Sequence, residues 1–524
     1  MSEGGLTHTG VRLPLGRRAL AWNVRLVLSR SGFHAFISVH ILVLFLVRGL
    51  LFPGTGGDDA EQLVFSQTLA WGYDIANPPL YTWLVVASQQ VFGVTVLSVA
   101  FVKFSLIWLT YVFLYRSARH VLEDDRLAAL AALSPLALYY VAWDAVLGYS
   151  HSVLLMAMCA VTFYAVLRLD AKGSVLSYLA LGLALGLGLL SKYPYALFAV
   201  SLLVACLADR SLRARLISPW SLLALAAAAA VILPHILWIV DQPDNLFSAS
   251  KAKFEISGGP GYVAAAATGV LDAAEAVVGF LSPLLILLLI FFWRAFGPVG
   301  RNASSSARYR RLLEVFFASL LAILFAAILV FAATRIRTHY MFILILFPIY
   351  FFARVRAVGL KQGSLERFAG VLPLLAVAVV GGLFFKYVAD PLRCSKCYLH
   401  VPYAEIADRI RERGFEKGTI FAFWHPYDIA GNLRVYFPDS RVITTKHLAF
   451  IPPPAREPGQ CLVMWNPHPT GWRHRVMVQL ANAHLGTKLT VDEPVRYVEV
   501  AMAMARDRPL RFAYILAQGQ GDCR

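Results

Sequence analysis

Charged residues are scarce in this chain. Asp, Glu, Lys and Arg make up only 15% of its 524 residues, and 58% of the residues are hydrophobic. A soluble domain has about 25% charged and about 45–50% apolar residues. The shortage of charge therefore excludes an ordinary soluble domain and indicates an integral membrane protein.

Several motifs are missing as well. The chain has no Walker-type phosphate loop, no zinc-ligand spacing and no G-x-S-x-G nucleophile elbow, which leaves phosphoryl transfer from ATP and serine hydrolysis unsupported. We therefore predict no metal and no cofactor. No small-residue cleavage site closes the first apolar run, so we interpret that run as an uncleaved span rather than a signal peptide.

Cysteines are too few for a disulfide scaffold. Four of the six follow the last apolar run, namely Cys394, Cys397, Cys461 and Cys523, and in an oxidising compartment four cysteines allow three pairings. The motif C-S-K-C suits neither a zinc site nor a thioredoxin-like pair. We favour a disulfide between Cys394 and Cys397 and leave the pairing of the other two open.

Apolar runs of about 17–25 residues are long enough to span a membrane as helices. We count eleven such runs, at residues 34–52, 94–115, 127–143, 150–168, 174–190, 194–208, 219–240, 274–293, 312–333, 338–353 and 369–388. The shorter stretch 79–92 follows a Pro pair and is interpreted as an outer interfacial helix. The sequence thus predicts a polytopic α-helical membrane protein with about eleven transmembrane helices.

Basic residues are divided unequally between the two sides of these spans. With the N-terminus inside, the inner segments carry 22 Lys and Arg and the outer loops carry 5. Cytoplasmic loops are enriched in Lys and Arg, so we expect a cytoplasmic N-terminus and an outer, periplasmic C-terminal part. This topology explains most of the formal net charge of +17 without a nucleic-acid partner.

A few basic residues break this rule. Lys103 falls near the middle of the second span and Arg48 in the last turns of the first, although a charge within a span costs about 2.5–3.5 kcal/mol. An anionic ligand bound at the outer face would account for several of these basic residues at once. The alternative for each of them is that its side chain snorkels to lipid phosphates. The remaining exceptions lie in two short outer turns. Lys192 is in SKYP, and Arg335, Arg337 and His339 are in TRIRTHY.

The stretch 56–83, directly after the first span, carries four acidic residues and no Lys or Arg. A helix that begins at Asp58 and ends near Gly72 would place Asp58, Asp59 and Glu61 at its N-terminus, where negative charge is favourable. The alternative is an amphipathic helix on the lipid surface between two spans. The topology puts the stretch on the outer side with the misplaced cations, and this favours a functional site.

Other polar residues on the outer side are open to two interpretations. Asp144 and His151 flank the tight turn between the third and fourth spans, where they either cap helices or face the same cavity as the acidic stretch. Asp272 and Glu275, near the start of the eighth span, are interpreted as membrane-interface residues.

Residues 389–524 contain no spanning run and are mixed in polarity. Their strand–helix–strand order indicates a small α/β domain. Strands are expected at 418–424, 441–445, 461–466, 496–504 and 510–518, with helices at 402–414 and 428–437. The predicted organisation is a basic N-terminus (1–33), a membrane part (34–388) with its first outer loop at 53–93, and an outer α/β domain (389–524).

A carboxylate that faces cations at a membrane surface suits group transfer from a lipid phosphate. The carboxylate would deprotonate an acceptor hydroxyl as general base, and Lys and Arg would neutralise the leaving phosphate. A transporter or flippase for an anionic or lipid-linked solute is the alternative, although transporters usually bind at the midplane of the membrane. A passive anchor for an outer binding module is disfavoured by the buried charges of Lys103 and Arg48.

The order of first span and acidic loop resembles the membrane glycosyltransferases of the GT-C superfamily. Within it, the protein-mannosyltransferase and aminoarabinose-transferase-like family has the pattern D-E-x-x-Y…G-Y…H-P-P-L. Asp58 and Asp59 take the two acidic positions, and residues 78–80 match P-P-L. Gln62 replaces the usual Tyr and Asn77 the usual His or Lys.

Further positions match the family pattern. Lys103 corresponds to a basic residue in the second span, and Lys192 lies in a turn that resembles one of the family. Asp144 corresponds to an Asp before the fourth span, although the motif around it differs. Cysteines near Cys394 and Cys397, just after the last span, also recur.

The resemblance implies a GT-C-like fold and inverting transfer of a sugar from a polyprenyl-phosphate carrier, at the outer face of a bacterial inner membrane. Asp58 would be the base, with Asp59 beside it. The acceptor would be lipopolysaccharide, another surface glycan, a glycolipid or a protein Ser or Thr. The variant D-D-A-E-Q-L is similar to bacterial members that modify lipopolysaccharide, including galacturonic-acid transferases. Substrate contacts are expected from Arg48, Glu61, Asn77, Lys103, Asp144, His151, Lys192, Arg335, Arg337 and His339.

Overall fold

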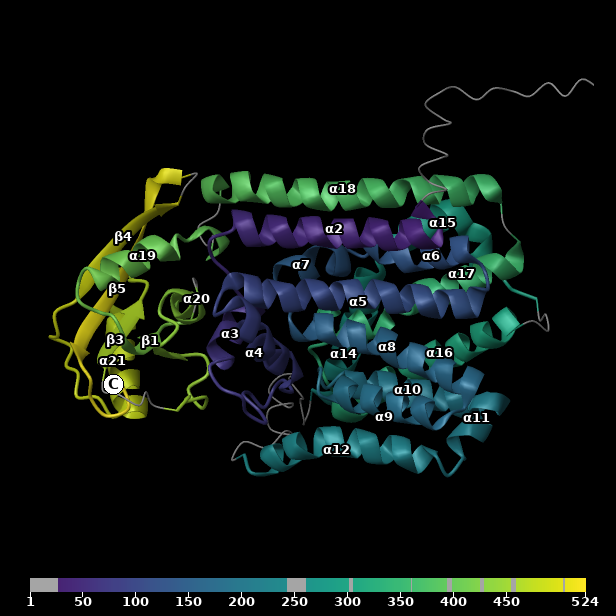
Figure 1. Ribbon diagram of the computed structural model, residues 1–524, viewed down its shortest axis with the longest axis horizontal. Coiled ribbons are helices and arrows are strands. Elements are labelled where there is room, and N and C mark those ends of the chain that lie inside the picture. Colours follow the sequence, from purple (N-terminus) through teal and green to yellow (C-terminus); the bar gives the residue numbers. More distant parts are fainter. Residues whose placement is uncertain are drawn as a thin grey trace, which may run out of the picture.

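The computed structural model describes residues 27–242, 261–300, 305–359, 361–393, 398–424, 428–453, 459–502 and 505–524. They form a bundle of helices and, at one end of it, a C-terminal domain built on a β-sheet (Figure 1). We call the opposite end of the bundle the far end. This division agrees with the predicted class, a helical membrane protein with a small α/β domain.

Seven helices in the described residues are long and apolar enough to cross a membrane, and nine if two bent pairs each count as one span. The seven are α2 (Arg30–Leu51), α5 (Val96–Leu122), α8 (His151–Lys172), α12 (Ser221–Val240), α14 (Tyr262–Leu281), α16 (Ser305–Phe331) and α18 (Gln362–Arg393). The bent pairs are α10 (Tyr195–Ala208) with α11 (Arg210–Leu216), and η4 (Thr338–Leu344) with α17 (Phe347–Val358). The protein is thus multi-pass, but the predicted count of eleven spans is not reproduced.

Two of the predicted spans are broken, and a third is short. Residues 127–143 fall in α6 (Asp125–Leu133), η1 (Ser134–Ala137) and η2 (Tyr140–Asp144), followed by α7 (Ala145–Leu147), and residues 127–138 are all buried. Residues 274–293 cross from α14 into α15 (Leu284–Phe292) and η3 (Trp293–Phe296), with a break at Pro283, which has no N–H to continue the helical ladder. The helix α9 (Val175–Leu189) has only 15 residues. Hydropathy reports burial, and here part of the burial is by protein rather than by lipid.

The acidic stretch forms a helix, as predicted, but a shorter one. Helix α3 (Asp58–Phe65) begins at the expected residue and ends seven residues before Gly72. The guanidinium of Arg434, in the C-terminal domain, binds the carbonyl oxygens of Leu63 and Ser66 and so caps the last turn. The interfacial helix expected at 79–92 is α4 (Leu80–Phe92).

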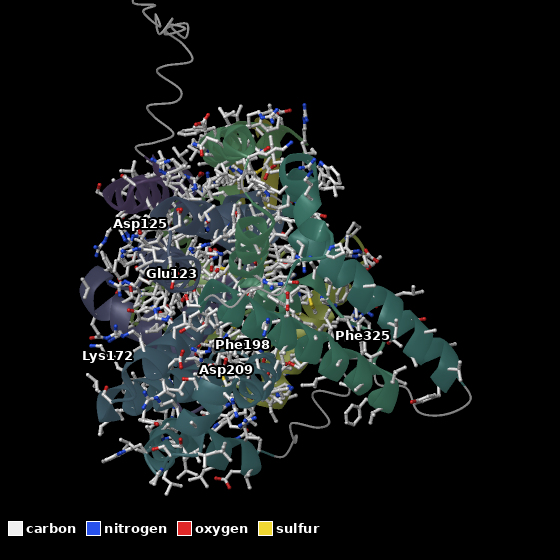
Figure 2. The ribbon with its side chains drawn as sticks, turned by 90° about the vertical axis from the view of Figure 1, so that its right-hand side faces the viewer. Glu123, Asp125, Lys172, Phe198, Asp209 and Phe325 are labelled. Carbon is white, nitrogen blue, oxygen red and sulfur yellow. A yellow bond between two sulfur atoms is a disulfide. The ribbon has the colours of Figure 1, made fainter. Side chains whose placement is uncertain are left out.

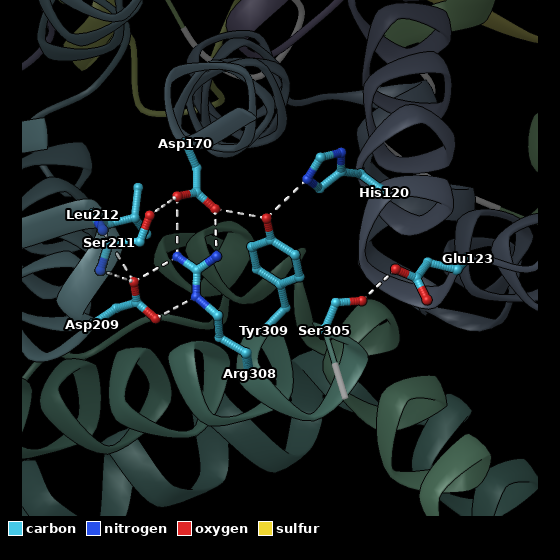
Figure 3. Close-up of polar contacts among 9 residues, drawn as sticks. All are labelled: His120, Glu123, Asp170, Asp209, Ser211, Leu212, Ser305, Arg308 and Tyr309. Carbon is cyan, nitrogen blue, oxygen red and sulfur yellow. Dashed lines mark hydrogen bonds and ion pairs between the residues drawn. The ribbon is translucent and has the colours of Figure 1, made fainter. Parts of the chain in front are cut away.

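Ion pairs join the helices at the far end, which faces the viewer in Figure 2. Arg308 of α16 pairs with Asp170 of α8 at 2.7 Å and with Asp209, the N-cap of α11, at 2.5 Å (Figure 3). Tyr309 donates to Asp170 at 2.7 Å and contacts His120 of α5 at 2.9 Å. Four helical elements are therefore fixed to one another at this end.

The C-terminal domain contains a five-stranded mixed sheet of order β2-β1-β3-β5-β4. Its first three strands are parallel neighbours, and β5 is antiparallel to both β3 and β4. The strands are β1 (Gly418–Ala422), β2 (Arg441–Thr444), β3 (Gln460–Trp465), β4 (Arg496–Met502) and β5 (Ala505–Gln518); the helices are η5 (Tyr398–His400), α19 (Tyr403–Arg411), α20 (Ile429–Tyr436) and α21 (Trp472–Leu485). Every predicted strand is present, whereas α21 was not predicted.

One disulfide lies within the described part of the chain. It joins Cys461 on β3 to Cys523 near the C-terminus, a pairing that the sequence left open. Cys394 and Cys397 lie outside the described residues, so the predicted bond between them stays a prediction.

Candidate active site

The first residue of α3, Asp58, is half-buried at the end of the bundle that carries the C-terminal domain. Its Oδ2 accepts hydrogen bonds from the backbone N–H and the hydroxyl of Ser150, at 3.1 and 3.3 Å. Burial raises the pKa of Asp58, and the nearby negative charge of Glu61 raises it further, whereas the hydrogen bond from Ser150 opposes this. A partly open carboxylate with increased proton affinity is suited to accept a proton.

The next residue, Asp59, is committed to an ion pair instead. Its Oδ2 lies 2.7 Å from Nζ of Lys103, and the two side chains are 6% and 1% exposed. The pair explains how α5 can carry a lysine inside a span, because a buried charge needs a partner. Although the two aspartates are adjacent in the sequence, their environments differ, and Asp58 is the better placed of the two to accept a proton.

Several buried polar atoms around this pair have no hydrogen-bond partner within the described chain. They are Nε and Nη1 of Arg48, Oδ1 of Asp59 and the hydroxyl of Tyr81. The third guanidinium nitrogen of Arg48 donates to Thr55 at 3.1 Å. Unsatisfied buried polar atoms are rare in native proteins, and this group of them is suited to meet a polar or anionic ligand.

Three consecutive residues at the start of α8, its N-cap Ser150 and then His151 and Ser152, connect Asp58 to the rest of the site. Ser150 binds Asp58, as described. The ring of His151 contacts Nε2 of Gln62 at 3.3 Å. Ser152 accepts a hydrogen bond from Nζ of Lys192 at 2.7 Å, and its hydroxyl lies 3.3 Å from the carbonyl oxygen of His339. This segment therefore gathers predicted site residues from four parts of the chain.

A pocket of about 330 Å³ opens beside this segment. Its lining includes Tyr149, which directly precedes Ser150, together with Arg337 and His339. Asp272 and Glu275, which were interpreted as interface residues, line it as well. The volume lies within the range of ligand pockets, roughly 300–1,000 Å³, and the lining offers a polar ligand both carboxylates and a guanidinium group.

Glu61 is held by the C-terminal domain. Its Oε1 lies 2.6 Å from Nζ of Lys446 and 2.6 Å from Nε2 of His447. Burial alone would raise the pKa of Glu61, but the hydrogen bond from His447 and the charge of Lys446 outweigh it and hold the pKa at about 2. The described contacts of Glu61 thus join α3 to the C-terminal domain.

The C-terminal domain also holds the beginning of α3. Oδ2 of Asp428 accepts from the N–H of Gly57, the N-cap of α3, at 2.6 Å. The side-chain amide of Asn432 bonds both backbone groups of Thr55, at 2.8 and 2.7 Å. Burial raises the pKa of Asp428 to about 7, against the hydrogen bond from Gly57.

The contact between α20 and α3 is close along its length. A Cβ on Gly431 would lie 2.1 Å from the carbonyl oxygen of Ala60, so the position requires glycine. At the other end Arg434 binds the carbonyl oxygens of Leu63 and Ser66, as described above, and the Ser66 hydroxyl at 2.8 Å. We call these contacts of Asp428, Asn432 and Arg434 with residues 55–66 the α20 clamp.

The structure does not bring every predicted residue into this group. Asn77 lies in a turn where its N–H donates to the carbonyl oxygen of Asp74 at 3.2 Å. Asp144 ends η2 and is half-buried. Arg335 is exposed and does not line the pocket that contains Arg337. A substrate role for these three stays a prediction.

Sequence reasoning missed the residues of the α20 clamp and the pair Lys446 and His447. They lie in a domain far along the chain, and no spacing motif connects them to α3. Ser150 and Tyr149 could have been found, because they lie directly between Asp144 and His151. Among the described residues, no group of three or more His, Cys, Asp and Glu is placed to hold a metal ion.

Comparisons with known proteins identify relatives of this chain. A family model described as dolichyl-phosphate-mannose-protein mannosyltransferase matches residues 76–238. The lipopolysaccharide core galacturonosyltransferase RgtB of Rhizobium johnstonii is 30% identical over 451 residues, which are 84% of this chain and 89% of RgtB. The lipopolysaccharide core galacturonosyltransferase RgtA of the same organism is 32% identical over 414 residues, which are 78% of this chain and 81% of RgtA.

The fold also has solved relatives. The structure of ArnT from Cupriavidus metallidurans bound to undecaprenyl phosphate is similar with a TM-score of 0.59 and 14% identity, and the match covers 93% of this chain and 98% of ArnT. At this identity the likeness concerns the fold alone. The identity to RgtB and RgtA, the match to the family model and the likeness of fold all agree. The chain belongs to the GT-C superfamily of membrane glycosyltransferases, in the protein-mannosyltransferase and aminoarabinose-transferase-like family.

Proposed function

We propose that this protein transfers galacturonic acid from a polyprenyl-phosphate carrier to a hydroxyl group of the lipopolysaccharide core, with inversion at the anomeric carbon. The observation that carries the proposal is Asp58, a half-buried carboxylate of raised pKa beside buried cations. The names of RgtB and RgtA support the sugar and the acceptor. The undecaprenyl phosphate in the ArnT structure is consistent with the carrier.

In the reaction, the oxygen of an acceptor hydroxyl attacks the anomeric carbon, and the bond from that carbon to the phosphate oxygen breaks. The hydroxyl proton passes to Asp58. The carrier leaves as polyprenyl phosphate with an added negative charge. We propose that this charge is stabilised by Arg48, two of whose nitrogens have no partner within the described chain, and by the ammonium of Lys192, which donates to Ser152.

The pocket lined by Tyr149, Arg337 and His339 is proposed to receive the sugar of the donor. Galacturonic acid differs from a neutral hexose by a carboxylate, and arginine binds carboxylates through two parallel hydrogen bonds. Because Tyr149 directly precedes the Ser150 that binds Asp58, a sugar in this pocket would lie next to the base.

The protein is proposed to reside in a bacterial inner membrane with its N-terminus in the cytoplasm. The far end would then face the cytoplasm, and the C-terminal domain, with Asp58, the periplasm. The unequal distribution of Lys and Arg supports this orientation.

The test is transfer by the purified full-length protein, with polyprenyl-phosphate-linked galacturonic acid and isolated lipopolysaccharide core. Asp58→Asn is expected to lower turnover by about 10²–10⁴-fold, the usual contribution of a general base. Asp74→Asn is the matched control, because Asp74 lies in the same loop but accepts from its own turn at Ala76. Release of polyprenyl phosphate and the mass of the core are the readouts. Near wild-type turnover of Asp58→Asn would exclude Asp58 as base, and transfer from a nucleotide sugar instead would exclude the carrier.

A further inference from the structure

A second pocket lies at the far end, away from Asp58. It has a volume of about 590 Å³ and opens between α2, α5 and α8. Four arginines from these three helices line it: Arg30, Arg116, Arg119 and Arg168. We call it the basic pocket. The other lining residues are two histidines and two tyrosines, so the basic pocket contains hydrogen-bond donors but no carboxylate.

Most of the positive charge in the basic pocket is not neutralised by the protein. Arg119 is ion-paired with Asp125. In the described part of the chain no Asp or Glu oxygen lies within ion-pair distance of Arg30, Arg116 or Arg168. Three like charges that converge on one hollow repel one another, and an anion bound between them would remove this cost.

Two further arginines at the same end, Arg308 and Arg310, are paired. Arg308 binds both Asp170 and Asp209 (Figure 3), and Arg310 pairs with Glu314 at 2.9 Å. Carboxylates are therefore available at the far end but are placed outside the basic pocket.

The wall of the basic pocket is fixed rather than loosely attached. His120 lines it and contacts the hydroxyl of Tyr309 at 2.9 Å, and Tyr309 in turn binds Asp170 (Figure 3). Tyr115, also in the lining, stacks on Phe33 of α2 with ring centroids 4.3 Å apart. A preformed wall lowers the entropy cost of binding a ligand.

We propose that the basic pocket binds the phosphate group of an anionic phospholipid from the membrane leaflet at the far end. Guanidinium groups bind phosphate through paired hydrogen bonds, and basic pockets between membrane helices bind anionic lipid headgroups. An arginine that only snorkels extends towards the lipid surface by itself, whereas these converge from three helices. A free phosphate compound has the same chemistry and is the other possible source.

The experiment measures lipid binding to the intact, detergent-purified protein by native mass spectrometry. Phosphatidylglycerol is compared with phosphatidylcholine of the same acyl chains, and inorganic phosphate serves as competitor. The test variant is Arg116→Gln with Arg168→Gln. The control, Lys172→Gln with Arg210→Gln, removes the same charge from exposed far-end residues outside the basic pocket.

We expect phosphatidylglycerol to bind the wild type at least about tenfold more tightly than phosphatidylcholine. Each arginine removed should weaken phosphatidylglycerol binding about fivefold, so the test variant should lose roughly 25-fold and the control less than about twofold. Arg116→Lys with Arg168→Lys keeps the charge but loses the paired hydrogen bonds, so its loss of binding should lie between zero and that of the test variant. The melting temperature of each variant reports whether it is folded.

The outcomes separate the two sources of phosphate. If phosphatidylglycerol binds selectively and inorganic phosphate does not displace it, the lipid is the ligand. If millimolar phosphate displaces it from the wild type, the pocket takes a phosphate group from either source, and the anion site stands. Equal binding of the two lipids, or equal losses in the test and control variants, would overturn the proposal.

Discussion

At the scale of single residues, the site depends on how two adjacent aspartates are surrounded. Asp58 begins α3 half-buried and binds only Ser150 among the hydrogen bonds that the structure describes for it. Asp59 is buried against Lys103. The first can therefore take part in proton transfer, and the second holds α3 against α5.

This difference predicts that the substitution of Asp by Asn affects stability at position 59 and turnover at position 58. Asp59→Asn should destabilise the folded protein by about 3–5 kcal/mol, because it leaves the ammonium of Lys103 buried without its counter-charge. Asp58→Asn should lower turnover, as proposed above, with little effect on stability. Thermal unfolding in detergent measures the first effect. If Asp59→Asn and Asp58→Asn have the same melting temperature, the buried pair of Asp59 and Lys103 does not contribute to stability.

Arg337 carries a prediction about the donor. Arg337→Ala should weaken binding of the galacturonic-acid donor by about 10–100-fold, since a hydrogen bond to a charged group contributes about 1.5–3 kcal/mol. A donor with neutral galactose should be affected much less. The ratio of kcat/KM for the two donors is the measurement, and Arg311→Ala, exposed at the far end, is the control. An unchanged ratio would mean that Arg337 does not recognise the carboxylate.

At the scale of elements, the α20 clamp determines where α3 lies. A helix of eight residues has little stability of its own, and α3 has no side-chain cap at its N-terminus. Asp428, from another domain, instead accepts from the N–H of the N-cap residue Gly57, and Arg434 binds carbonyl oxygens at the opposite end. The C-terminal domain therefore contributes to the position of Asp58 without lining the pocket beside it.

Removal of the clamp at one end should loosen α3. Arg434→Ala leaves the carbonyl oxygens of Leu63 and Ser66 without this donor, and each unsatisfied buried group costs about 1–3 kcal/mol. Hydrogen exchange of the amides in residues 58–66 should become faster in Arg434→Ala. Arg409→Ala, at an exposed ion pair with Glu405 on α19, should leave it unchanged. Equal exchange in both variants would show that the clamp does not hold α3.

The other end of the clamp predicts a dependence on pH. The pKa of Asp428 is raised from 3.8 to about 7 in the folded protein, so the folded state binds this proton more tightly than the unfolded state. Stability therefore falls as the pH rises from about 4 to about 7, and the loss is complete above pH 7. Asp428→Asn keeps an acceptor for Gly57 but cannot ionise. Its melting temperature relative to wild type should increase from pH 5 to pH 8; a constant difference would contradict the raised pKa.

At the scale of the whole molecule, the two ends of the bundle are chemically different. One end carries Asp58, the pocket beside it and the C-terminal domain, whereas the far end carries the ion pairs of Arg308 and the basic pocket. Such polarity suits an enzyme that meets its substrates on one side of a membrane and is anchored on the other.

The orientation of these ends can be measured by labelling cysteines in intact cells. A membrane-impermeant maleimide should label Ala404→Cys, exposed on α19, and should not label Lys172→Cys, exposed at the far end. The unsubstituted protein provides the background of its native cysteines, of which Cys159 and Cys206 are buried. Labelling of Lys172→Cys alone would reverse the proposed topology.

Much of this architecture follows from the sequence alone. The scarcity of charge, the apolar runs and the distribution of Lys and Arg are local properties of the chain, and they determined the membrane class and the two-part organisation. The acidic loop and its resemblance to a family identified the enzyme class and directed attention to Asp58. The number of spans could not be obtained this way, because an apolar run such as 127–138 is equally suited to burial in protein.

Only the tertiary structure decided how the site is assembled. It paired Asp59 with Lys103, 44 positions apart, and Glu61 with Lys446, 385 positions apart. It also separated Arg337, in the pocket, from Arg335 outside it. Contacts at such separations depend on how helices and domains pack, and neither periodicity nor spacing in one sequence records them. For this reason the sequence could propose Asp58 as the base, whereas the surroundings of Asp58 came from the fold.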